Sequence, residues 1–297
     1  MNQHHDTHPI TRRIRQKVHE DLASASRHAE RDEDQATLVT IGARVETSLS
    51  RIDAHLRGGR IAPAPPIRLS LQAPARAPVD RVVRLGVFPV NGNPLHWGHL
   101  IAALDAIGLR RLDLVVMIIQ GRDLRKRVSV VTERHRHAMA RDVLGVLAPL
   151  VAYSDIGRGT AFVGEDNVFR LLRLNPRQRI EAHYLVGSDH YRRLDDRGAP
   201  DTLTRLERHL AATEYGLDPR MHELKVLVLE RDRRLVPVET SLDVAFVPVA
   251  FDASSTAVRE GRPLLAPYRV QRYCHRHAGY AEHIASTRVL TGAMKPR

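Results

Sequence analysis

Apolar residues recur at helical spacing through residues 1–60 of the chain. One stripe repeats every three or four positions, at Leu38, Ile41, Val45, Leu49, Ile52 and Leu56. A shorter stripe precedes it, at Ile14, Val18 and Leu22. Both have the period of one face of an amphipathic helix, and Gly58-Gly59 after the longer stripe is typical of a helix end. We therefore predict a helical extension over residues 1–60, whose apolar face either packs on the rest of the chain or pairs with a second copy as a homo-oligomer.

The rest of the chain alternates short apolar runs with helical patterns. Residues 61–80 are rich in proline and alanine, which predicts a semi-rigid linker. After it we predict strands over Val82–Val90, Leu112–Ile119, Leu150–Tyr153, Ala182–Val186, Leu224–Leu229 and Val244–Val247, and helices over His99–Leu109, Arg134–Val146 and Asn167–Leu174. Alternation of this kind predicts an α/β fold, a Rossmann-like parallel sheet flanked by helices, over residues 81–297.

Composition narrows the class of protein. The chain has 297 residues, of which 43% are hydrophobic, and this excludes a wholly disordered protein. Its single cysteine, Cys274, excludes an intramolecular disulfide and fits a reducing compartment. Residues 1–6 do not begin an apolar signal segment, and no apolar run approaches the length of a membrane span. We therefore expect a cytoplasmic protein without a membrane partner.

The net charge indicates an anionic partner. The formal charge is +12 at pH 7, which favours binding of nucleotide phosphates or of nucleic acid. A basic surface without a specific partner is the alternative. Only 4% of the residues are aromatic, which leaves little material for stacking on bases. We therefore expect small phosphorylated ligands rather than nucleic acid.

The clearest chemical signal follows the first predicted strand. The apolar run breaks at Asn91-Gly92-Asn93-Pro94, and a helical pattern then opens with His96 and His99. Histidines three residues apart lie on one helix face, and the free backbone N–H groups at a helix N-terminus favour an anion. Gly98, between the two histidines, leaves room for a ligand close to the backbone. A strand, a turn and a helix in this order predict a polyphosphate site.

Two later segments carry related chemistry. Ser254, Ser255 and Thr256 precede a helical pattern, and Arg259 lies one turn further along. Hydroxyl groups cap helices and a guanidinium binds phosphate oxygens, so this segment predicts a second anion site; an ordinary capped helix is the alternative. The fourth predicted strand ends in Gly187-Ser188-Asp189, where the glycine admits a ligand and the carboxylate can accept hydrogen bonds from a base or a sugar.

Together these segments resemble those of a known family. Residues 86–100 resemble the first signature of the nucleotidyltransferase superfamily with a His-x-Gly-His element, and are most similar to that of the nicotinate/nicotinamide mononucleotide adenylyltransferases. Residues 253–259 resemble the family's closing signature, Ile-Ser-Ser-Thr-x-Ile-Arg, and residues 187–189 resemble its Gly-Ala-Asp segment. The segment around Tyr273 resembles the family's terminal helix. The resemblance spans residues 81–281 and leaves out the N-terminal extension.

The resemblance implies an adenylyltransferase that binds ATP. By it, His96 and His99 would hold the triphosphate and stabilise charge at the α-phosphate, and Arg259 would secure the leaving pyrophosphate. Further contacts to ATP and its phosphates would come from Asn91, Gly92, Asn93, Gly98, Gly187, Asp189, Ser254, Ser255 and Thr256. Mg²⁺ would be bound through the phosphates of ATP, so no carboxylate cage of the protein's own is expected.

The resemblance is less complete on the acceptor side. Residues 132–139 are similar to the family's Ser-Pro-Glu-His-Arg-x-x-Met helix, and residues 121–127 take the place of its Pro-His-Lys loop. On this basis Lys126 and Arg136 would contact the phosphate of the acceptor; a solvated basic face is the alternative. Residues 89–93 replace the family's Gly-Gly-Thr-Phe-Asp, and its tryptophan after Gly-x-Asp is absent. Phosphate chemistry is expected to be retained, whereas the identity of the acceptor stays open.

We therefore predict an enzyme that joins the AMP moiety of ATP to a phosphate-bearing acceptor and releases pyrophosphate. The expected acceptor is nicotinate or nicotinamide mononucleotide, which would place the reaction in NAD biosynthesis. Another acceptor, or CTP as donor, would use the same chemistry. The altered loop at residues 89–93 leaves one further alternative, a non-catalytic nucleotide sensor with the helical extension as its output surface.

Overall fold

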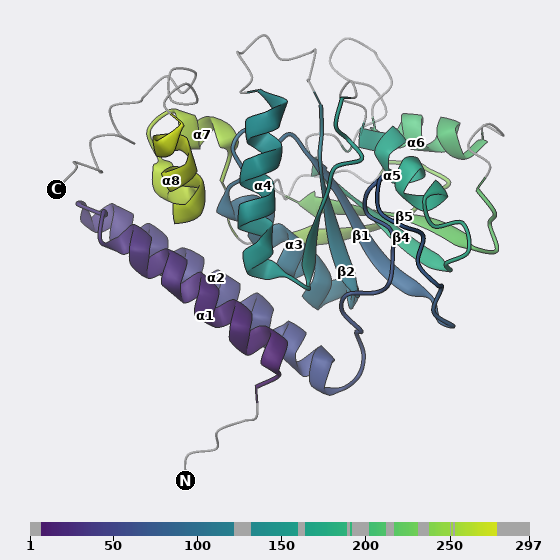
Figure 1. Ribbon diagram of the computed structural model, residues 1–297, viewed down its shortest axis with the longest axis horizontal. Coiled ribbons are helices and arrows are strands. Elements are labelled where there is room, and N and C mark those ends of the chain that lie inside the picture. Colours follow the sequence, from purple (N-terminus) through teal and green to yellow (C-terminus); the bar gives the residue numbers. More distant parts are fainter. Residues whose placement is uncertain are drawn as a thin grey trace.

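A parallel sheet forms the centre of the protein in a computed structural model, which describes residues 7–121, 132–159, 164–188, 191, 202–211, 217–230, 238–249, 251 and 253–277. The strands are β1 (Val83–Val90), β2 (Leu114–Ile119), β3 (Val151–Ser154), β4 (Ile180–Gly187), β5 (His222–Glu230) and β6 (Asp243–Pro248). They pair in parallel in the order β3-β2-β1-β4-β5-β6 (Figure 1). The predicted α/β fold with a Rossmann-like sheet is confirmed.

Helices cover both faces of the sheet. One face packs on α3 (Trp97–Arg110), α4 (Glu133–Leu147) and α8 (Tyr268–Arg276), and the other packs on α5 (Gly164–Arg173) and α6 (Thr202–Ala211). A short helix α7 (Ser255–Arg259) and a 3₁₀ helix η3 (Pro263–Leu265) precede α8. Successive residues of β2 alternate between the two cores, as the geometry of a strand requires. Because β2 is buried on both faces, its sequence is a continuous apolar run.

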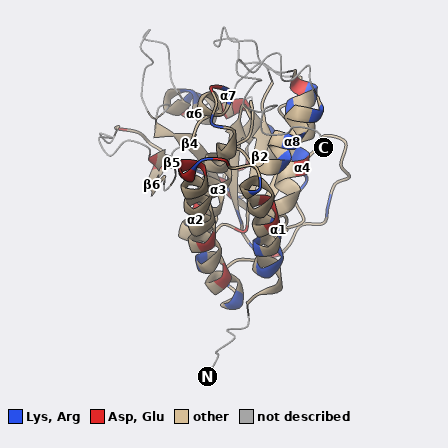
Figure 2. Ribbon diagram, turned by 90° about the vertical axis from the view of Figure 1, so that its left-hand side faces the viewer, with Lys and Arg blue, Asp and Glu red and all other residues tan. Residues whose placement is uncertain are grey.

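The N-terminal helices pack along this sheet domain. α1 (Pro9–Ser26) and α2 (Asp32–Arg57) lie side by side, and α2 lies along α3 (Figures 1 and 2). The predicted stripe of α2 is buried, and its residues belong to the same hydrophobic core as those of α3. Packing within the chain therefore accounts for the apolar stripe of the extension.

Two buried carboxylates fix the extension in place. The Ser48 hydroxyl of α2 donates a hydrogen bond to Asp105 Oδ1 of α3 at 2.6 Å. The backbone N–H of Tyr268 in α8 donates to Asp21 Oδ2 of α1 at 2.8 Å. Burial raises the pKa of both carboxyl groups, and these hydrogen bonds offset part of the effect. Each contact joins the extension to a different helix of the sheet domain.

The proline-rich segment 61–80 is held against the sheet by side chains of the domain. The Asp113 carboxylate, which is fully buried, accepts hydrogen bonds from the backbone N–H of Ala62 at 2.7 Å and from that of Arg84 at 3.0 Å. The Asn175 amide accepts from the N–H of Arg68 at 2.7 Å and donates to its carbonyl at 3.0 Å. The segment is thus a fixed strap across one end of the domain.

We expect Asp113→Asn to lower the free energy of unfolding by about 2 kcal/mol. Both carboxylate oxygens of Asp113 accept hydrogen bonds, including one from the Arg81 guanidinium at 2.7 Å, whereas an asparagine has a single acceptor oxygen. Urea denaturation measures the change. The control is Asp243→Asn, because the side chain of Asp243 is 67% exposed. Equal stability of the two variants would contradict the role given to Asp113.

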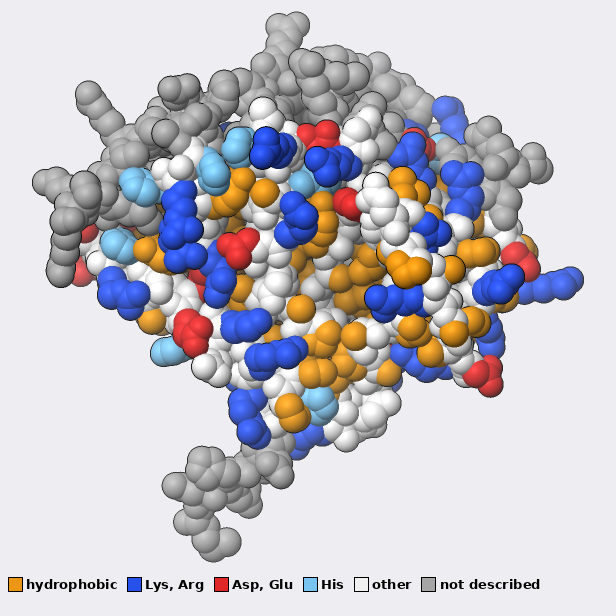
Figure 3. Space-filling view, viewed as in Figure 1, with side chains coloured by type: hydrophobic (Ala, Val, Ile, Leu, Met, Phe, Trp, Pro, Cys, Tyr) orange, Lys and Arg blue, Asp and Glu red, His pale blue; other side chains and the backbone are white. Residues whose placement is uncertain are grey.

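The face of the molecule shown in Figure 3 carries more basic than acidic side chains. Lys and Arg side chains are spread over the face shown in Figure 3, with few Asp and Glu side chains among them, in keeping with the net charge of +12. None of the helices described combines the length and the apolar composition that crossing a membrane requires.

Candidate active site

The candidate site lies where the order of the strands reverses, between β1 and β4. Ligands of open parallel sheets bind beyond the carboxyl ends of the strands at such a point. The pairing of β1 with β4 ends at Val87 and Tyr184, whereas the pairing of β1 with β2 continues to Val90 and Ile119. The last residues of β1 are therefore not paired with β4, and we call the gap between these strand ends the opening. Gly164 lies against it, because a Cβ on this glycine would meet both Pro89 and Tyr184.

The same separation explains a proline in a central strand. The carbonyl of Val90 accepts a hydrogen bond from the N–H of Gln120 on the β2 side, so the nitrogen of Pro89, one residue earlier, faces the β4 side. Pairing on that side has already ended, and no ladder hydrogen bond is lost to the missing N–H. Pro89 thus belongs to β1, and the altered loop begins only at Asn91.

His96 and His99 lie against each other at the start of α3. His96 is the N-cap residue, and the two ring centroids are 3.7 Å apart. The backbone N–H of His96 donates to Nδ1 of His99 at 3.4 Å, and the His99 ring meets Phe88 of β1 edge-on, with the centroids 6.0 Å apart. Since Nδ1 of His99 accepts a hydrogen bond, the neutral ring carries its proton on Nε2.

The structure changes the interpretation of Gly98. A Cβ at this position would lie 3.0 Å from Nδ1 of His96 and 3.2 Å from the Cβ of Ala253. On the side where a Cβ would lie, the space is filled by the His96 ring and by the segment that precedes α7. Gly98 is required because it lets these two parts of the chain meet.

The hydroxyl-rich segment joins the histidine segment although the two are far apart in the sequence. The Ser255 hydroxyl donates to the carbonyl of Pro94 at 2.9 Å, and Nη1 of Arg259 donates to the carbonyl of Asn93 at 2.5 Å. Arg259 also donates to the Thr256 hydroxyl at 3.0 Å. These contacts bring the two predicted anion-binding segments into one site.

Within that segment the hydroxyl groups differ in what they contact. Ser254 is the N-cap of α7, and its hydroxyl accepts from the N–H of Ala257 at 3.0 Å. Oδ1 of Asn93 is buried and accepts no hydrogen bond from the residues that the structure describes, so the site contains an acceptor that a ligand could use. Gly92 has a φ of +61°, a conformation that favours glycine.

Arg136, for which the sequence predicts a contact with the acceptor phosphate, has partners within the protein. Its side chain is buried, and Nη1 donates to the carbonyls of Asn91 at 2.7 Å and Gln120 at 2.6 Å. Nη2 donates to the carbonyl of Gly121 at 3.2 Å. The guanidinium therefore joins the loop after β1 to the end of β2. Its burial favours bracing of this loop over the predicted contact with an acceptor phosphate.

Two of the predicted site residues, Lys126 and Asp189, lie outside the described residues, as does the segment at 192–200, where the family's tryptophan is missing. Gly187 ends β4, and Ser188 after it is buried. The described residues include no group of three or more His, Cys, Asp or Glu side chains placed to hold a metal.

Sequence reasoning missed two buried amides beside the same opening. The amide nitrogen and oxygen of Gln120, which follows β2, are buried without a hydrogen-bond partner in the described part of the chain, and so are those of Asn167 in α5. A Cβ on Gly164, one turn before Asn167, would lie 2.8 Å from Nε2 of Gln120 and 2.5 Å from the Tyr184 hydroxyl. For Gln120 the signal available was a polar residue directly after an apolar strand, at the edge of the sheet where ligands bind; Asn167, inside α5, offers no comparable signal.

Proteins of similar sequence carry one name. A "Probable nicotinate-nucleotide adenylyltransferase" from Mycobacterium bovis is 25% identical over 194 residues, which cover 64% of this chain and 87% of the relative. The protein of the same name from Thermoanaerobacter sp. is 23% identical over 210 residues, which cover 68% of this chain and 96% of the relative. That of Gemmatimonas aurantiaca is 34% identical over 108 residues, which cover 36% of this chain and 50% of the relative.

The chain is a nucleotidyltransferase-like enzyme. The resemblance predicted from three short motifs is confirmed over most of the length of these relatives. No family model matches this chain. Among solved structures, the nicotinic acid mononucleotide adenylyltransferase of Plasmodium falciparum, complexed with NaAD, is 13% identical with a TM-score of 0.43, and covers 67% of this chain and 97% of that one. The likeness is weak.

Proposed function

We propose that the protein is an adenylyltransferase that transfers the AMP moiety of ATP to nicotinate or nicotinamide mononucleotide and releases pyrophosphate. The observation that carries the proposal is the junction of two segments at the carboxyl end of β1. His96 and His99 begin α3 there, and Arg259 is bonded to the loop that precedes them. The names of the sequence relatives support the same reaction.

The reaction needs no nucleophile from the protein. A phosphate oxygen of the acceptor attacks the α-phosphorus of ATP, the bond from this phosphorus to the bridging oxygen breaks, and pyrophosphate leaves with that oxygen. His99 would donate from Nε2 to a non-bridging oxygen of the α-phosphate, where charge develops. Arg259 would stabilise the departing pyrophosphate through its positive charge.

Mg²⁺ fits this site as a companion of ATP. The side chains brought together around His96, His99 and Arg259 are neutral or basic, and the described residues offer no cluster of metal ligands. A divalent ion would therefore be held through the phosphates of ATP and by water, where it would neutralise part of the triphosphate charge.

We place the acceptor at the opening between β1 and β4. Gln120 and Asn167 present buried amide donors and acceptors beside this opening, close to Gly164. A buried amide without a partner costs free energy, and a ligand with polar groups of its own would supply the missing partners. The ring substituent and the sugar hydroxyls of a pyridine mononucleotide offer such groups.

Replacing Gln120 is expected to change the binding of the acceptor without lowering the stability of the protein. We expect Gln120→Met to leave the free energy of unfolding unchanged or to raise it by about 1 kcal/mol, because the native amide is unpaired. The KM for the acceptor is expected to rise about tenfold while the KM for ATP stays the same, since one to two hydrogen bonds are lost. Urea denaturation and steady-state kinetics measure both.

The matched control is Gln178→Met. This glutamine is equally buried, but its amide accepts from the N–H of Val79 at 2.9 Å and donates to the carbonyl of Arg81 at 3.0 Å. We expect this variant to be destabilised with the acceptor KM unchanged. A destabilised Gln120→Met protein with a normal acceptor KM would contradict the acceptor site.

The proposed function is tested by incubating the protein with Mg²⁺-ATP and, separately, nicotinate mononucleotide, nicotinamide mononucleotide or phosphopantetheine, and measuring pyrophosphate. Release with a pyridine mononucleotide is expected. Release with phosphopantetheine alone would identify another acceptor within the same chemistry. ATP binding without release would overturn the enzyme proposal in favour of a nucleotide sensor.

A further inference from the structure

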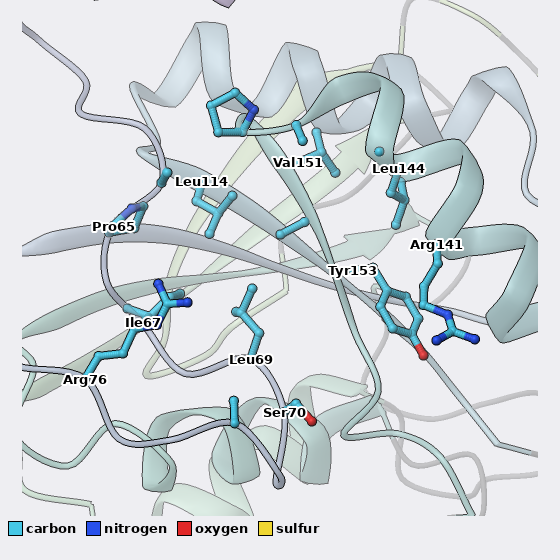
Figure 4. A pocket seen from close by; sticks show the side chains of 16 residues that line it. Pro65, Ile67, Leu69, Ser70, Arg76, Leu114, Arg141, Leu144, Val151 and Tyr153 are labelled. Carbon is cyan, nitrogen blue, oxygen red and sulfur yellow. The ribbon is translucent and has the colours of Figure 1, made fainter.

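A cavity lies under the strap formed by residues 61–80. It has a volume of about 400 Å³ and is bounded by this strap, by the C-terminal part of α4 and by β2 and β3 (Figure 4). Its lining is mainly apolar and includes Ile67, Leu69, Leu114, Leu144, Val151 and Tyr153. Volume and lining are those of a pocket for a small organic ligand.

The cavity is separate from the proposed active site. Leu114 and Val151 are the first residues of β2 and β3. The active site follows the last residue of β1, whereas the cavity extends along β3 only as far as Tyr153, which pairs with Met117, two residues before the end of β2. None of the residues proposed to bind ATP or the acceptor lines the cavity.

The wall formed by the strap is held in place by hydrogen bonds. The Ser154 hydroxyl at the end of β3 donates to the carbonyl of Leu69 at 2.6 Å. The backbone N–H and carbonyl of Arg68, which precedes Leu69, are both hydrogen-bonded to the side-chain amide of Asn175. Ile67 is 3% exposed and anchors the strap in the core. The cavity is therefore a shaped space with defined walls.

The charged groups of the cavity are all positive. Arg76 of the strap and Arg141 of α4 line it, and no carboxylate does. Neither guanidinium forms an ion pair with a residue in the described part of the chain. Figure 4 shows Arg76 near Ile67 on one side and Arg141 beside Tyr153 on the other. An apolar space whose charges are two unpaired arginines is complementary to an amphiphilic anion.

Arg141 is the better placed of the two arginines. It extends from α4, and its guanidinium carbon lies 6.0 Å from the centre of the ring of Tyr153, which also lines the cavity. The Tyr153 hydroxyl lies 2.5 Å from Nδ1 of His137. Burial raises the pKa of Tyr153 to about 12, so the phenol is neutral at pH 7 and does not compete with a ligand for the arginine.

We propose that this cavity binds a small amphiphilic carboxylate. Its apolar chain lies among Ile67, Leu69 and Leu144, and its carboxylate pairs with Arg141. The proposal is independent of the adenylyltransferase reaction, because it uses none of the residues assigned to that reaction. The protein then has two classes of ligand: nucleotides at the active site and an apolar acid in this cavity.

Binding of decanoate and of decanol to the full chain, measured by isothermal titration calorimetry below their micelle concentrations, tests the proposal. One decanoate is expected to bind per chain, with decanol at least about tenfold weaker, since the two share the apolar chain and differ in charge. No binding of decanoate, or equal binding of decanol, would overturn the proposal.

Two arginine variants locate the site. Arg141→Gln is expected to weaken decanoate binding about tenfold and to leave that of decanol unchanged. Arg177→Gln makes the same change of charge at an exposed position outside the cavity and should bind decanoate normally. Equal affinities of the two variants for decanoate would overturn the assignment. Circular dichroism shows that both variants are folded. Pyrophosphate release is measured in a separate assay, so that a failure of the adenylyltransferase proposal can be told apart from a failure of decanoate binding.

Discussion

His99→Ala is expected to lower kcat by about 10²–10³-fold, which is the loss found when one preorganised donor to a developing negative charge is removed. The Nδ1 atom of His99 accepts the N–H of His96, so the ring is held with Nε2 as its donor. An alanine removes that donor and also the acceptor of the His96 N–H at the start of α3, so the fold of the variant is checked beside its activity. The KM for ATP should change much less than kcat, because charge on the α-phosphate oxygens grows mainly in the transition state.

Steady-state pyrophosphate release measures both parameters. The control is His275→Ala, since His275 is an exposed histidine of α8 to which no role in the reaction is assigned. Circular dichroism and the urea midpoint show that both variants are folded. A folded His99→Ala protein with near-normal kcat would contradict the role of the histidine pair.

Arg136→Met is expected to lower the free energy of unfolding by about 3 kcal/mol. The change removes the shared donor of the carbonyls of Asn91 and Gln120, which then lose their buried partner. It also frees the loop after β1, which carries Asn91 and Asn93 into the active site, so kcat should fall as well.

Arg134→Met is the matched control, because Arg134 precedes Arg136 by two residues on the same helix and is exposed. The two variants lose the same charge, and only one loses the buried hydrogen bonds. The free energies of unfolding are measured by urea denaturation. If both variants have the value of the native protein, the loop does not depend on Arg136.

The sheet could be predicted from the sequence because its strands are buried on both faces. A strand such as β2 then consists of apolar residues alone, and it is bounded by residues that cannot continue it. The histidine pair could be predicted for a similar reason, since a local spacing of three residues fixes its geometry on α3.

The contacts across the chain could not be predicted in the same way. The sequence contains Arg136 in a basic helix, and only the fold places its guanidinium among the carbonyls of two loops. Gly98 likewise serves the approach of Ala253, a residue far along the chain. Gln120 and Asn167 become notable only once burial has removed water from both amides.

The fate of a label on ATP distinguishes adenylyl transfer from other uses of ATP. The protein is incubated with Mg²⁺, nicotinate or nicotinamide mononucleotide, and ATP that is radiolabelled either at the α- or at the γ-phosphate. An adenylyltransferase places the α-label in a dinucleotide and the γ-label in pyrophosphate. The γ-label in the acceptor or in inorganic phosphate, with the α-label remaining in a mononucleotide, would contradict the account.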